Sequence, residues 1–504
     1  MKQLQVFGAL FAVAVLGAAP SVAEEESAPG AGGRNNPLNA VVKLEVSTAK
    51  PDICRPWVTR TDSATGSGVV IDNGRILTCA HCVTDACYIR VRKHNEDMLY
   101  HGSVQFLDHD ADLALVGVDD PAFMAGITPM EIGETPHVQD DVLAVGYPLG
   151  GEDISFTRGI VSRIEDTNYS HSLMCLLGIQ VDAAINKGNS GGPVLDLKSG
   201  KIAGIAFQGR GKDEGESLGY IIPPDIIRHF LKDIQDGSVD GFADNLFSVG
   251  YLESPAKRRY YKMDAGCSGV IVEDVDAVLG KDSLRTGDII LEIGGFKVSN
   301  SGRIRLLSGE PRSLNYPIYM CQIGEKVPVK VYRDGAVVET HITAAKKSIL
   351  MRRWMYDTKP DYFVYGGFVF TTLSLDYLIR TNAAFHDNLV GDKNFADEEA
   401  VVISFCFADA GIEGYIGCAD SLVRSVNGVN VRNLRHLVEI VDACKEGFVC
   451  FGLDRNTEWD VKAIVDAKEM RESTVRVMQR NLIPFDRSED LRDLGGKHRV
   501  QKEN

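Results

Sequence analysis

The segment Ala184-Ile-Asn-Lys-Gly-Asn-Ser190-Gly-Gly-Pro-Val-Leu195 combines one serine with a dense set of glycines. It lies between two apolar runs that are typical of strands, Ile179–Ile185 and Pro193–Leu195. Glycines allow a tight turn and a close approach of the backbone to another molecule. Such a turn can aim the amides of Gly188 and Ser190 at one point, where a negatively charged oxygen would be stabilised. The pattern predicts a nucleophilic serine, with a plain glycine-rich hairpin turn as the alternative.

Two upstream segments supply the other groups that a nucleophilic serine needs. Leu77-Thr-Cys-Ala-His81-Cys-Val83 ends an apolar strand, and Asp108-His-Asp-Ala-Asp112-Leu-Ala-Leu115 places carboxylates directly before another strand. A serine hydroxyl needs an adjacent base, and the base needs an acid that orients it. The order His, Asp, Ser is that of the chymotrypsin type and differs from subtilisin and the α/β-hydrolases. We interpret His81, one of these carboxylates and Ser190 as a catalytic triad, although each segment alone is more often structural.

These motifs resemble the Deg/HtrA serine proteases. The protease motifs are LTCAHCV, DADLAL, DAAINKGNSGGPV and GYIIP (Gly219–Pro223). Two later segments, Tyr362–Leu378 and Arg424–Leu434, look like the second PDZ-like domain of the plant and bacterial Deg proteases. The resemblance extends from about Ala40 to about Pro484. It implies a mostly β chain in which a chymotrypsin-like double β-barrel precedes two PDZ-like α+β domains.

The resemblance also implies roles for single residues. The family motif places the triad acid immediately before Leu-Ala-Leu, which selects Asp112 and leaves Asp108 and Asp110 as solvated turn residues. The amide of Asn189 becomes a third oxyanion donor beside those of Gly188 and Ser190. Strand Ile202–Gln208 would pair with the substrate as an added strand. Because no acidic residue stands where a trypsin-like pocket needs one, Ile205, Ala206 and Phe207 predict a substrate site for small or medium apolar side chains. His101 and His109 are expected to be surface groups.

The chain has 504 residues, too many for one core, and the expected division follows the resemblance. Hydrophobic residues at 44% and charged residues at 25% are typical of a globular protein, and a net charge of −16 argues against binding to nucleic acid or anionic membranes. The expected parts are a signal peptide (1–23), a flexible leader (24–37), a trypsin-like serine protease domain (38–236), PDZ-like domain 1 (245–348), PDZ-like domain 2 (355–484) and a disordered tail (485–504).

The N-terminus has the pattern of a targeting segment. Lys2 precedes the apolar run Val6–Ala18, and Ser21-Val-Ala23 is a small-residue cleavage site before three glutamates. The run is short for a membrane span, so a retained anchor is the less favoured alternative. We therefore expect an exported protein, periplasmic or secreted, in which the sequon at Asn168 would matter only in a eukaryotic secretory compartment.

Eleven cysteines are spread over the whole chain and do not form a dense disulfide framework. Cys82 follows the catalytic histidine at a position that is disulfide-bonded in many secreted chymotrypsin-like proteases, with Cys54 or Cys87 as the partner. A zinc site made of Cys79, His81, Cys82 and Cys87 is the alternative. We disfavour it because neighbouring cysteines of a strand point to opposite faces.

The sequence predicts a serine endopeptidase that needs neither ATP nor a metal or cofactor. The resemblance implies misfolded or damaged polypeptides as substrates and a homo-oligomer of trimers or their multiples. The family's long activation loop is not evident between Arg60 and Gly66. Two alternatives remain: a chaperone or adaptor that binds unfolded chains through its PDZ-like domains, and an esterase that uses the same triad.

Overall fold

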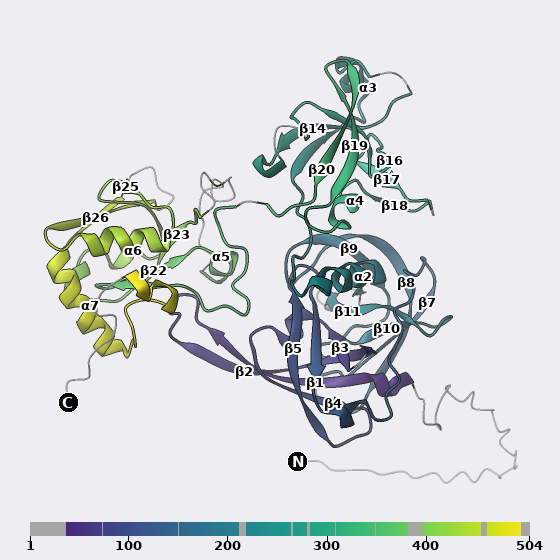
Figure 1. Ribbon diagram of the computed structural model, residues 1–504, viewed down its shortest axis with the longest axis horizontal. Helices are drawn as coiled ribbons and strands as arrows, with labels where there is room; N and C mark the ends of the chain where they lie inside the picture. The colour runs from purple at the N-terminus through teal and green to yellow at the C-terminus, as the bar shows by residue number, and fades with distance from the viewer. Residues whose placement is uncertain are drawn as a thin grey trace, which may run out of the picture.

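The computed structural model describes residues 37–494 with short gaps and shows a mostly β protein (Figure 1). The gaps are 73, 150, 211–217, 264–265, 280–282, 308, 348, 382–392, 394–396 and 455–460. The expected signal peptide, the leader, most of the polar loop 209–217 and residues 495–504 lie outside the described residues. Within the described part, none of the helices has the length and apolar character needed to cross a membrane.

The first six strands close into a barrel in the order β1-β2-β3-β6-β5-β4. Val42, Leu44 and Val46 alternate along β1 and are at most 2% exposed, which is the period expected of a strand with one face in a core. A single helical turn, α1 (Ala80–Val83), follows β3. The strands are β1 (Val41–Pro51), β2 (Thr59–Asp72), β3 (Arg75–Thr78), β4 (Ala86–Lys93), β5 (Leu99–Asp108) and β6 (Leu113–Val118).

The next six strands close into a second barrel in the order β10-β11-β12-β9-β8-β7. Its interior is packed with side chains such as Val181, Val194 and Ala203, which are fully buried. The amphipathic helix that follows, α2 (Pro224–Asp233), starts with proline in its first turn, where the missing amide costs no hydrogen bond. The strands are β7 (Asp141–Gly146), β8 (Ser155–Asn168), β9 (Cys175–Val181), β10 (Pro193–Asp196), β11 (Ile202–Arg210) and β12 (Leu218–Ile222).

A third unit is a curled sheet with the path β13-β14-β15-β19-β20. It rests on the second barrel, where the hydroxyl of Tyr319 donates to Asp166 Oδ1 at 2.6 Å and Lys232 pairs with Glu325 at 3.0 Å. Its elements are β13 (Phe247–Tyr251), α3 (Pro255–Tyr260), β14 (Val270–Val275), β15 (Ile289–Ile293), β16 (Phe296–Lys297), β17 (Arg303–Arg305), β18 (Pro311–Ser313), α4 (Tyr316–Tyr319), β19 (Lys326–Arg333) and β20 (Ala336–Thr343).

The last unit is a seven-stranded sheet with the path β21-β22-β23-β24-β26-β27 and two longer helices. The long β1–β2 hairpin reaches it (Figure 1): Trp57 packs edge-on against Tyr362, and Ser404 Oγ donates to the carbonyl of Cys54. The elements are β21 (Phe363–Tyr365), β22 (Phe368–Thr372), α5 (Leu375–Thr381), β23 (Val401–Cys406), β24 (Ser421–Val426), β25 (Val429–Asn430), α6 (Leu434–Ala443), β26 (Phe448–Asp454), β27 (Val461–Asp466) and α7 (Ala467–Asn481).

The prediction of a disordered tail from residue 485 is wrong as far as residue 494. Arg487 is 3% exposed and donates two hydrogen bonds to the carboxylate of Asp442. A 3-10 helix, Glu489–Leu494, then buries Leu491 against the last sheet. The charged residues suggested a solvated segment, but their partners lie on the sheet domain itself.

Candidate active site

His81 and Asp112 are joined by two hydrogen bonds. His81 Nδ1 donates to Asp112 Oδ2 at 2.7 Å, and the backbone amide of His81 donates to Asp112 Oδ1 at 2.8 Å. The amide of Ala80 also donates to the carbonyl of Asp112, so the α1 turn is attached to the acid at three points. Asp112 is fully buried, whereas about a third of the His81 side chain is exposed. Because Nδ1 is engaged, Nε2 is the nitrogen left to accept a proton.

Two thiols lie beside this histidine. Burial alone would lower the pKa of His81, but the charges of Cys82 and Asp112 and their hydrogen bonds raise it well above 6.5. The neighbouring Cys79 and His81 lower the pKa of the Cys82 thiol. Burial raises the pKa of the Cys79 thiol. Cys79 Sγ lies 3.3 Å from the carbonyl of Ala206, which places it behind the histidine and next to β11.

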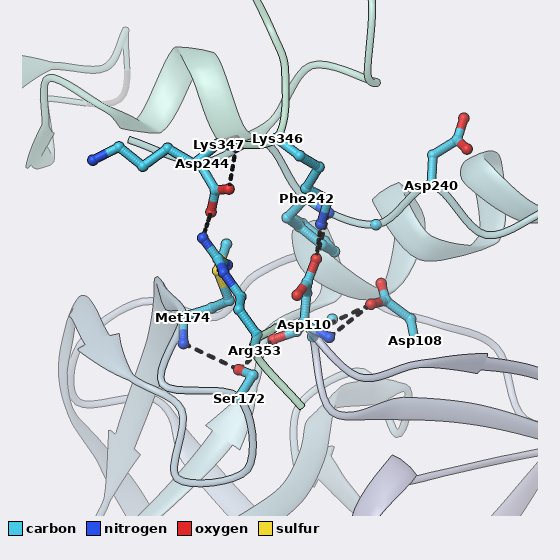
Figure 2. Close-up of polar contacts among 12 residues, drawn as sticks. Asp108, Asp110, Ser172, Met174, Asp240, Phe242, Asp244, Lys346, Lys347 and Arg353 are labelled. Carbon is cyan, nitrogen blue, oxygen red and sulfur yellow. Dashed lines mark hydrogen bonds and ion pairs between the residues drawn. The ribbon is translucent and has the colours of Figure 1, made fainter. Parts of the chain in front are cut away.

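The turn that carries Asp112 is held by buried polar contacts, which Figure 2 shows in part. Asp108 is 2% exposed, and its Oδ1 accepts hydrogen bonds from the amides of Asp110 and Ala111. Burial and the nearby Asp110 raise the pKa of Asp108 to about 7. The carboxylate of Asp110 accepts from the amide of Phe242 and pairs with Lys346 (Figure 2). The prediction that Asp108 and Asp110 are solvated is therefore wrong.

The segment that follows the third unit returns to this turn. The ring of Tyr356 stacks on that of His171 with 4.3 Å between centroids, and its hydroxyl donates to the carbonyl of the same histidine. Asp357 pairs with His109 at 3.0 Å and exchanges backbone–carboxylate hydrogen bonds with Asp85. His109 is thus half-buried and paired rather than a free surface group, whereas His101 is exposed as expected.

The same segment is fixed further along by Arg353, whose guanidinium donates to Asp244 Oδ1 at 2.5 Å (Figure 2). The indole of Trp354 donates to the carbonyl of Ser172, a residue in the loop before β9. His171, in that loop, lies 6.2 Å from His81 between ring centroids. The returning segment therefore contacts both loops that flank the histidine.

The serine turn is built from backbone contacts that require glycine. The amide of Gly191 donates to the carbonyl of Ala206 at 2.8 Å, and the carbonyl of Ser190 accepts from the amide of Ser67 at 2.9 Å. Gly191 has a φ of +82°, and a Cβ there would lie 2.2 Å from the carbonyl oxygen of Ser67. A side chain at this position would thus be strained by its backbone angle and by overlap with the neighbouring strand.

The three expected oxyanion donors differ in their hydrogen bonds. The amide of Asn189 donates to the carbonyl of Asn186 at 3.0 Å and is therefore already engaged. Within the part of the chain that the structure describes, no acceptor is recorded for the amides of Gly188 and Ser190. The carbonyl of Gly188 is turned away and accepts from Ser67 Oγ at 2.8 Å. Of the three expected donors, the amides of Gly188 and Ser190 are therefore the two without a hydrogen bond to another described group.

Ser190 lies beside the histidine turn but is not hydrogen-bonded to the histidine itself. Cys82 Sγ is 3.5 Å from the carbonyl oxygen of Ser190, which brings the serine turn against α1. Among the described residues, the hydroxyl of Ser190 has no recorded hydrogen bond to His81 or to any other group. Catalytic hydrogen bonds are often long or misaligned without substrate and tighten in the complex.

The side chains predicted to bind substrate are enclosed. Ile205, Ala206 and Phe207 are at most 3% exposed, and the backbone of Ala206 is already paired with Gly191 and Gly192. The next residues of β11, 208–210, pair only with β12, whereas β10 pairs with residues up to Ile205. The part of β11 with an edge open to β-addition is therefore residues 208–210, which follow the predicted Ile205, Ala206 and Phe207.

All eleven cysteines are free thiols, so the prediction of a disulfide from Cys82 to Cys54 or Cys87 is wrong. Cys87 is exposed on β4 and contacts the carbonyl of Ser47, outside the cluster around His81. Donor atoms of Cys79, His81 and Asp112 do lie within 4.8 Å of one another. The argument that cysteines of a strand diverge does not apply, because β3 ends at Thr78 and the chain then makes a helical turn.

Sequence reasoning missed several residues that support the site. Ser67 connects the two barrels, since its hydroxyl donates to the carbonyl of Gly188 and accepts from the amide of Tyr147. Its place between Gly66 and Gly68 is a signal that could have identified it. No local signal points to the stack of His171 and Tyr356, because these residues are far apart in the sequence.

Comparisons with known proteins agree with the resemblance inferred from the motifs. A trypsin-like peptidase model matches residues 66–205, and a PDZ model matches residues 351–490. The protease Do-like 4 of Arabidopsis thaliana, mitochondrial by its name, is 36% identical over 414 residues, which are 81% of this chain and 77% of that protein. The chloroplastic protease Do-like 2 of the same plant is 33% identical over 467 residues, which are 90% of this chain and 75% of that protein.

The peptidase match includes all three predicted triad positions, and the relatives align with most of both chains. Identity above 30% over this length confirms the resemblance inferred from the motifs. The chain is a serine endopeptidase of the Deg/HtrA, or Do-like, family.

Proposed function

We propose that the protein hydrolyses peptide bonds with His81, Asp112 and Ser190, without ATP or a metal. Ser190 Oγ attacks the carbonyl carbon, His81 Nε2 takes its proton, and the tetrahedral oxyanion accepts from the amides of Gly188 and Ser190. His81 then gives the proton to the leaving amine. The observation that carries this proposal is the pair of hydrogen bonds from His81 to the buried Asp112, next to the Ser190 turn.

In this proposal Asp112 acts by orienting the imidazole. Its carboxylate accepts from Nδ1 and from the backbone amide of the same histidine, which fixes the ring and its tautomer. The carbonyl of Ser190 is held by the amide of Ser67, and the hydroxyl of Ser190 would have to turn toward Nε2. Substrate binding would supply this alignment.

The substrates we propose are misfolded or damaged polypeptides. An extended segment would pair with the open edge of β11 at residues 208–210, which requires a substrate stretch without stable structure. Main-chain pairing is tolerant of sequence, and this suits a protein that removes unfolded chains. A small or medium apolar side chain at the cleaved position remains the prediction from the absence of an acidic pocket residue.

The test compares Ser190→Ala with Ser199→Ala, which changes an exposed serine in the turn between β10 and β11. Ser190→Ala should abolish cleavage of casein, whereas Ser199→Ala should cleave it at the wild-type rate. Cleavage by Ser190→Ala would show that the nucleophile lies elsewhere. Suppression of aggregation by the inactive Ser190→Ala chain would show that the protein also acts as a chaperone, the alternative function considered for its PDZ-like domains.

We further propose that residues 1–23 direct the chain out of the compartment of its synthesis and are then removed. The names of the relatives, mitochondrial and chloroplastic, make an organelle the alternative destination to the periplasm or the outside of the cell. N-terminal sequencing of the mature protein and the location of a fluorescent fusion distinguish these outcomes. Retention of Met1 would refute the cleavage.

We also propose that the division into a protease domain (38–236) and PDZ-like domains (245–348 and 355–484) holds in solution, and that protomers form trimers or their multiples. The mass of the native particle, measured by light scattering with and without reductant, tests the assembly. A monomeric mass at micromolar concentration would contradict it.

A further inference from the structure

Three potential metal ligands converge at His81, and a second thiol, that of Cys82, lies next to them. Cys79 Sγ, a ring nitrogen of His81 and a carboxylate oxygen of Asp112 lie within 4.8 Å of one another. Cys82 is a neighbour of both Cys79 and His81, which lower the pKa of its thiol, and its Sγ lies 3.5 Å from the carbonyl oxygen of Ser190. Thiolate, imidazole and carboxylate are the three ligand types that Zn²⁺ takes in proteins.

The local fold explains why the two thiols meet. Strand β3 ends at Thr78, Cys79 is the N-cap of α1, and the next residues form a helical turn. Residues three apart in such a turn lie on the same face, so Cys79 and Cys82 point the same way. The spacing Cys-x-x-Cys is that of many structural zinc sites.

The distances suit the ion. Tetrahedral zinc has bonds of about 2.3 Å to sulfur and about 2.0 Å to nitrogen, which places neighbouring donor atoms roughly 3.3–3.8 Å apart. The donor atoms of Cys79, His81 and Asp112, which lie within 4.8 Å, can reach that spacing by a contraction of about 1 Å, and rotation of the Cys82 side chain would bring the fourth ligand to the ion. A Cβ at position 66 would lie 2.9 Å from Cys82 Sγ, so the glycine there leaves the thiol room.

The surroundings also provide support and access. The Cys79 sulfur lies 3.3 Å from the carbonyl of Ala206, and the backbone amide of His81 donates to Asp112 Oδ1, which leaves Oδ2 for the ion. Such outer contacts orient metal ligands. About a third of the His81 side chain is exposed, which gives an entry path from the cleft.

We propose that Zn²⁺ binds to Cys79, Cys82, His81 and Asp112 and reversibly inhibits the protease. The ion takes the place of the hydrogen bond between His81 and Asp112, so the imidazole can no longer be oriented to accept the proton of Ser190. This inhibition rests on the proposed catalytic role of His81. The binding of zinc at this site does not depend on that role, and the proposed catalysis needs no metal. The ligand set differs from the one considered from the sequence, because Asp112 replaces Cys87.

Binding is tested on the full chain carrying Ser190→Ala, which prevents self-cleavage, under reductant. Co²⁺, a spectroscopic substitute for zinc, should give the near-ultraviolet thiolate charge-transfer absorption at one ion per chain. Cys79→Ser and Cys82→Ser should each weaken it, and Cys87→Ser, the matched control, should keep it. Equal absorption in all variants would overturn the proposal, because the exposed cysteines would then be the ligands.

A second measurement needs no cysteine variant and holds even if Cys79→Ser, at a fully buried position, does not fold. X-ray absorption of the zinc-loaded Ser190→Ala chain should show two sulfur ligands at about 2.3 Å and two nitrogen or oxygen ligands at about 2.0 Å. A shell of oxygen and nitrogen alone would refute the site.

Inhibition is tested with the active chain and casein. At a free Zn²⁺ concentration of about ten times Kd, cleavage should fall to about one tenth, and a chelator should restore it. Each cysteine variant is compared with its own zinc-free rate, and Cys82→Ser should lose the zinc effect while Cys87→Ser retains it. Absorption without inhibition would refute the inhibitory role, whereas cleavage by Ser190→Ala would refute the proposed nucleophile and leave the absorption result intact.

Discussion

Replacing Asp108 by asparagine should stabilise the protein at alkaline pH and change it little at acid pH. Asp108 is 2% exposed, and its Oδ1 accepts from the amides of Asp110 and Ala111. Its Oδ2 is buried and has no hydrogen-bond partner among the described residues. Burial, with the charge of Asp110, raises the pKa of this carboxyl from the ordinary 3.8 to about 7. Asparagine keeps the accepting oxygen and cannot ionise.

The sign follows from the direction of that shift. The folded protein holds the proton of Asp108 more tightly than the unfolded chain does, so its stabilising effect is complete below about pH 4 and is lost as the pH rises through about 7. Between these values the loss is about 1.4 kcal/mol per pH unit, which sums to about 4 kcal/mol. Relative to the wild type, Asp108→Asn should therefore gain up to about 4 kcal/mol at about pH 8.5 and nearly nothing at about pH 4.

The assay is urea unfolding of both chains in a Ser190→Ala background, followed by the near-ultraviolet circular dichroism signal across this pH range. Asp119→Asn, which removes an exposed carboxylate of the same barrel, controls for the loss of one negative charge. A stability difference that is the same at both ends of the range would show that Asp108 does not titrate between them. A loss of stability at alkaline pH would mean that the ionised carboxylate stabilises the fold, for example through its attraction to the charge of Lys346.

Three further outcomes follow from the site. Ser67→Ala leaves the carbonyl of Gly188 without its buried donor, and should cost about 1–3 kcal/mol in urea unfolding and lower kcat more than it raises KM. Gly191→Ala should give an inactive or unfolded chain, because a Cβ there would lie 2.2 Å from the carbonyl oxygen of Ser67. Gly200 also has a positive φ but has open space around it, so Gly200→Ala should lower the free energy of unfolding by about 1–2 kcal/mol and keep casein cleavage. Tyr356→Leu removes the ring stack and the hydroxyl hydrogen bond that hold the returning segment, so added trypsin should cut that segment faster than in the wild type; an unchanged cleavage rate would contradict this.

Much of the strand pattern could be predicted because each barrel strand carries its own period-two signal. The run Ala40–Ser47 matches β1, and the amphipathic stretch after Pro223 matches α2 with its proline start. The α1 turn could not be predicted in the same way. Four residues are too few to show helical period, and this turn is stabilised by hydrogen bonds to Asp112 rather than by its own sequence.

The candidate site residues could be proposed from short motifs, but their environment could not. The resemblance selected His81, Asp112 and Ser190, and the structure brings the first two into contact and the third alongside. Asn189 was proposed as an oxyanion donor by analogy, yet its amide is used by the turn itself. A motif gives the residue types of a site, whereas the direction of each amide depends on the three-dimensional turn.

The wrong predictions share one physical cause. Asp108, Asp110, His109 and Arg487 were assigned to solvent because charged side chains are mostly exposed. In the structure each of them is buried or paired in a way that the local sequence does not reveal. The partner of Asp110, for example, is Lys346, which follows it by 236 residues. A charge buried without such a partner would cost several kcal/mol, so these pairs have to form together with the interfaces that bury them. The turn that carries Asp112 is therefore completed by residues that follow the third unit, since Lys346 pairs with Asp110 and Asp357 pairs with His109.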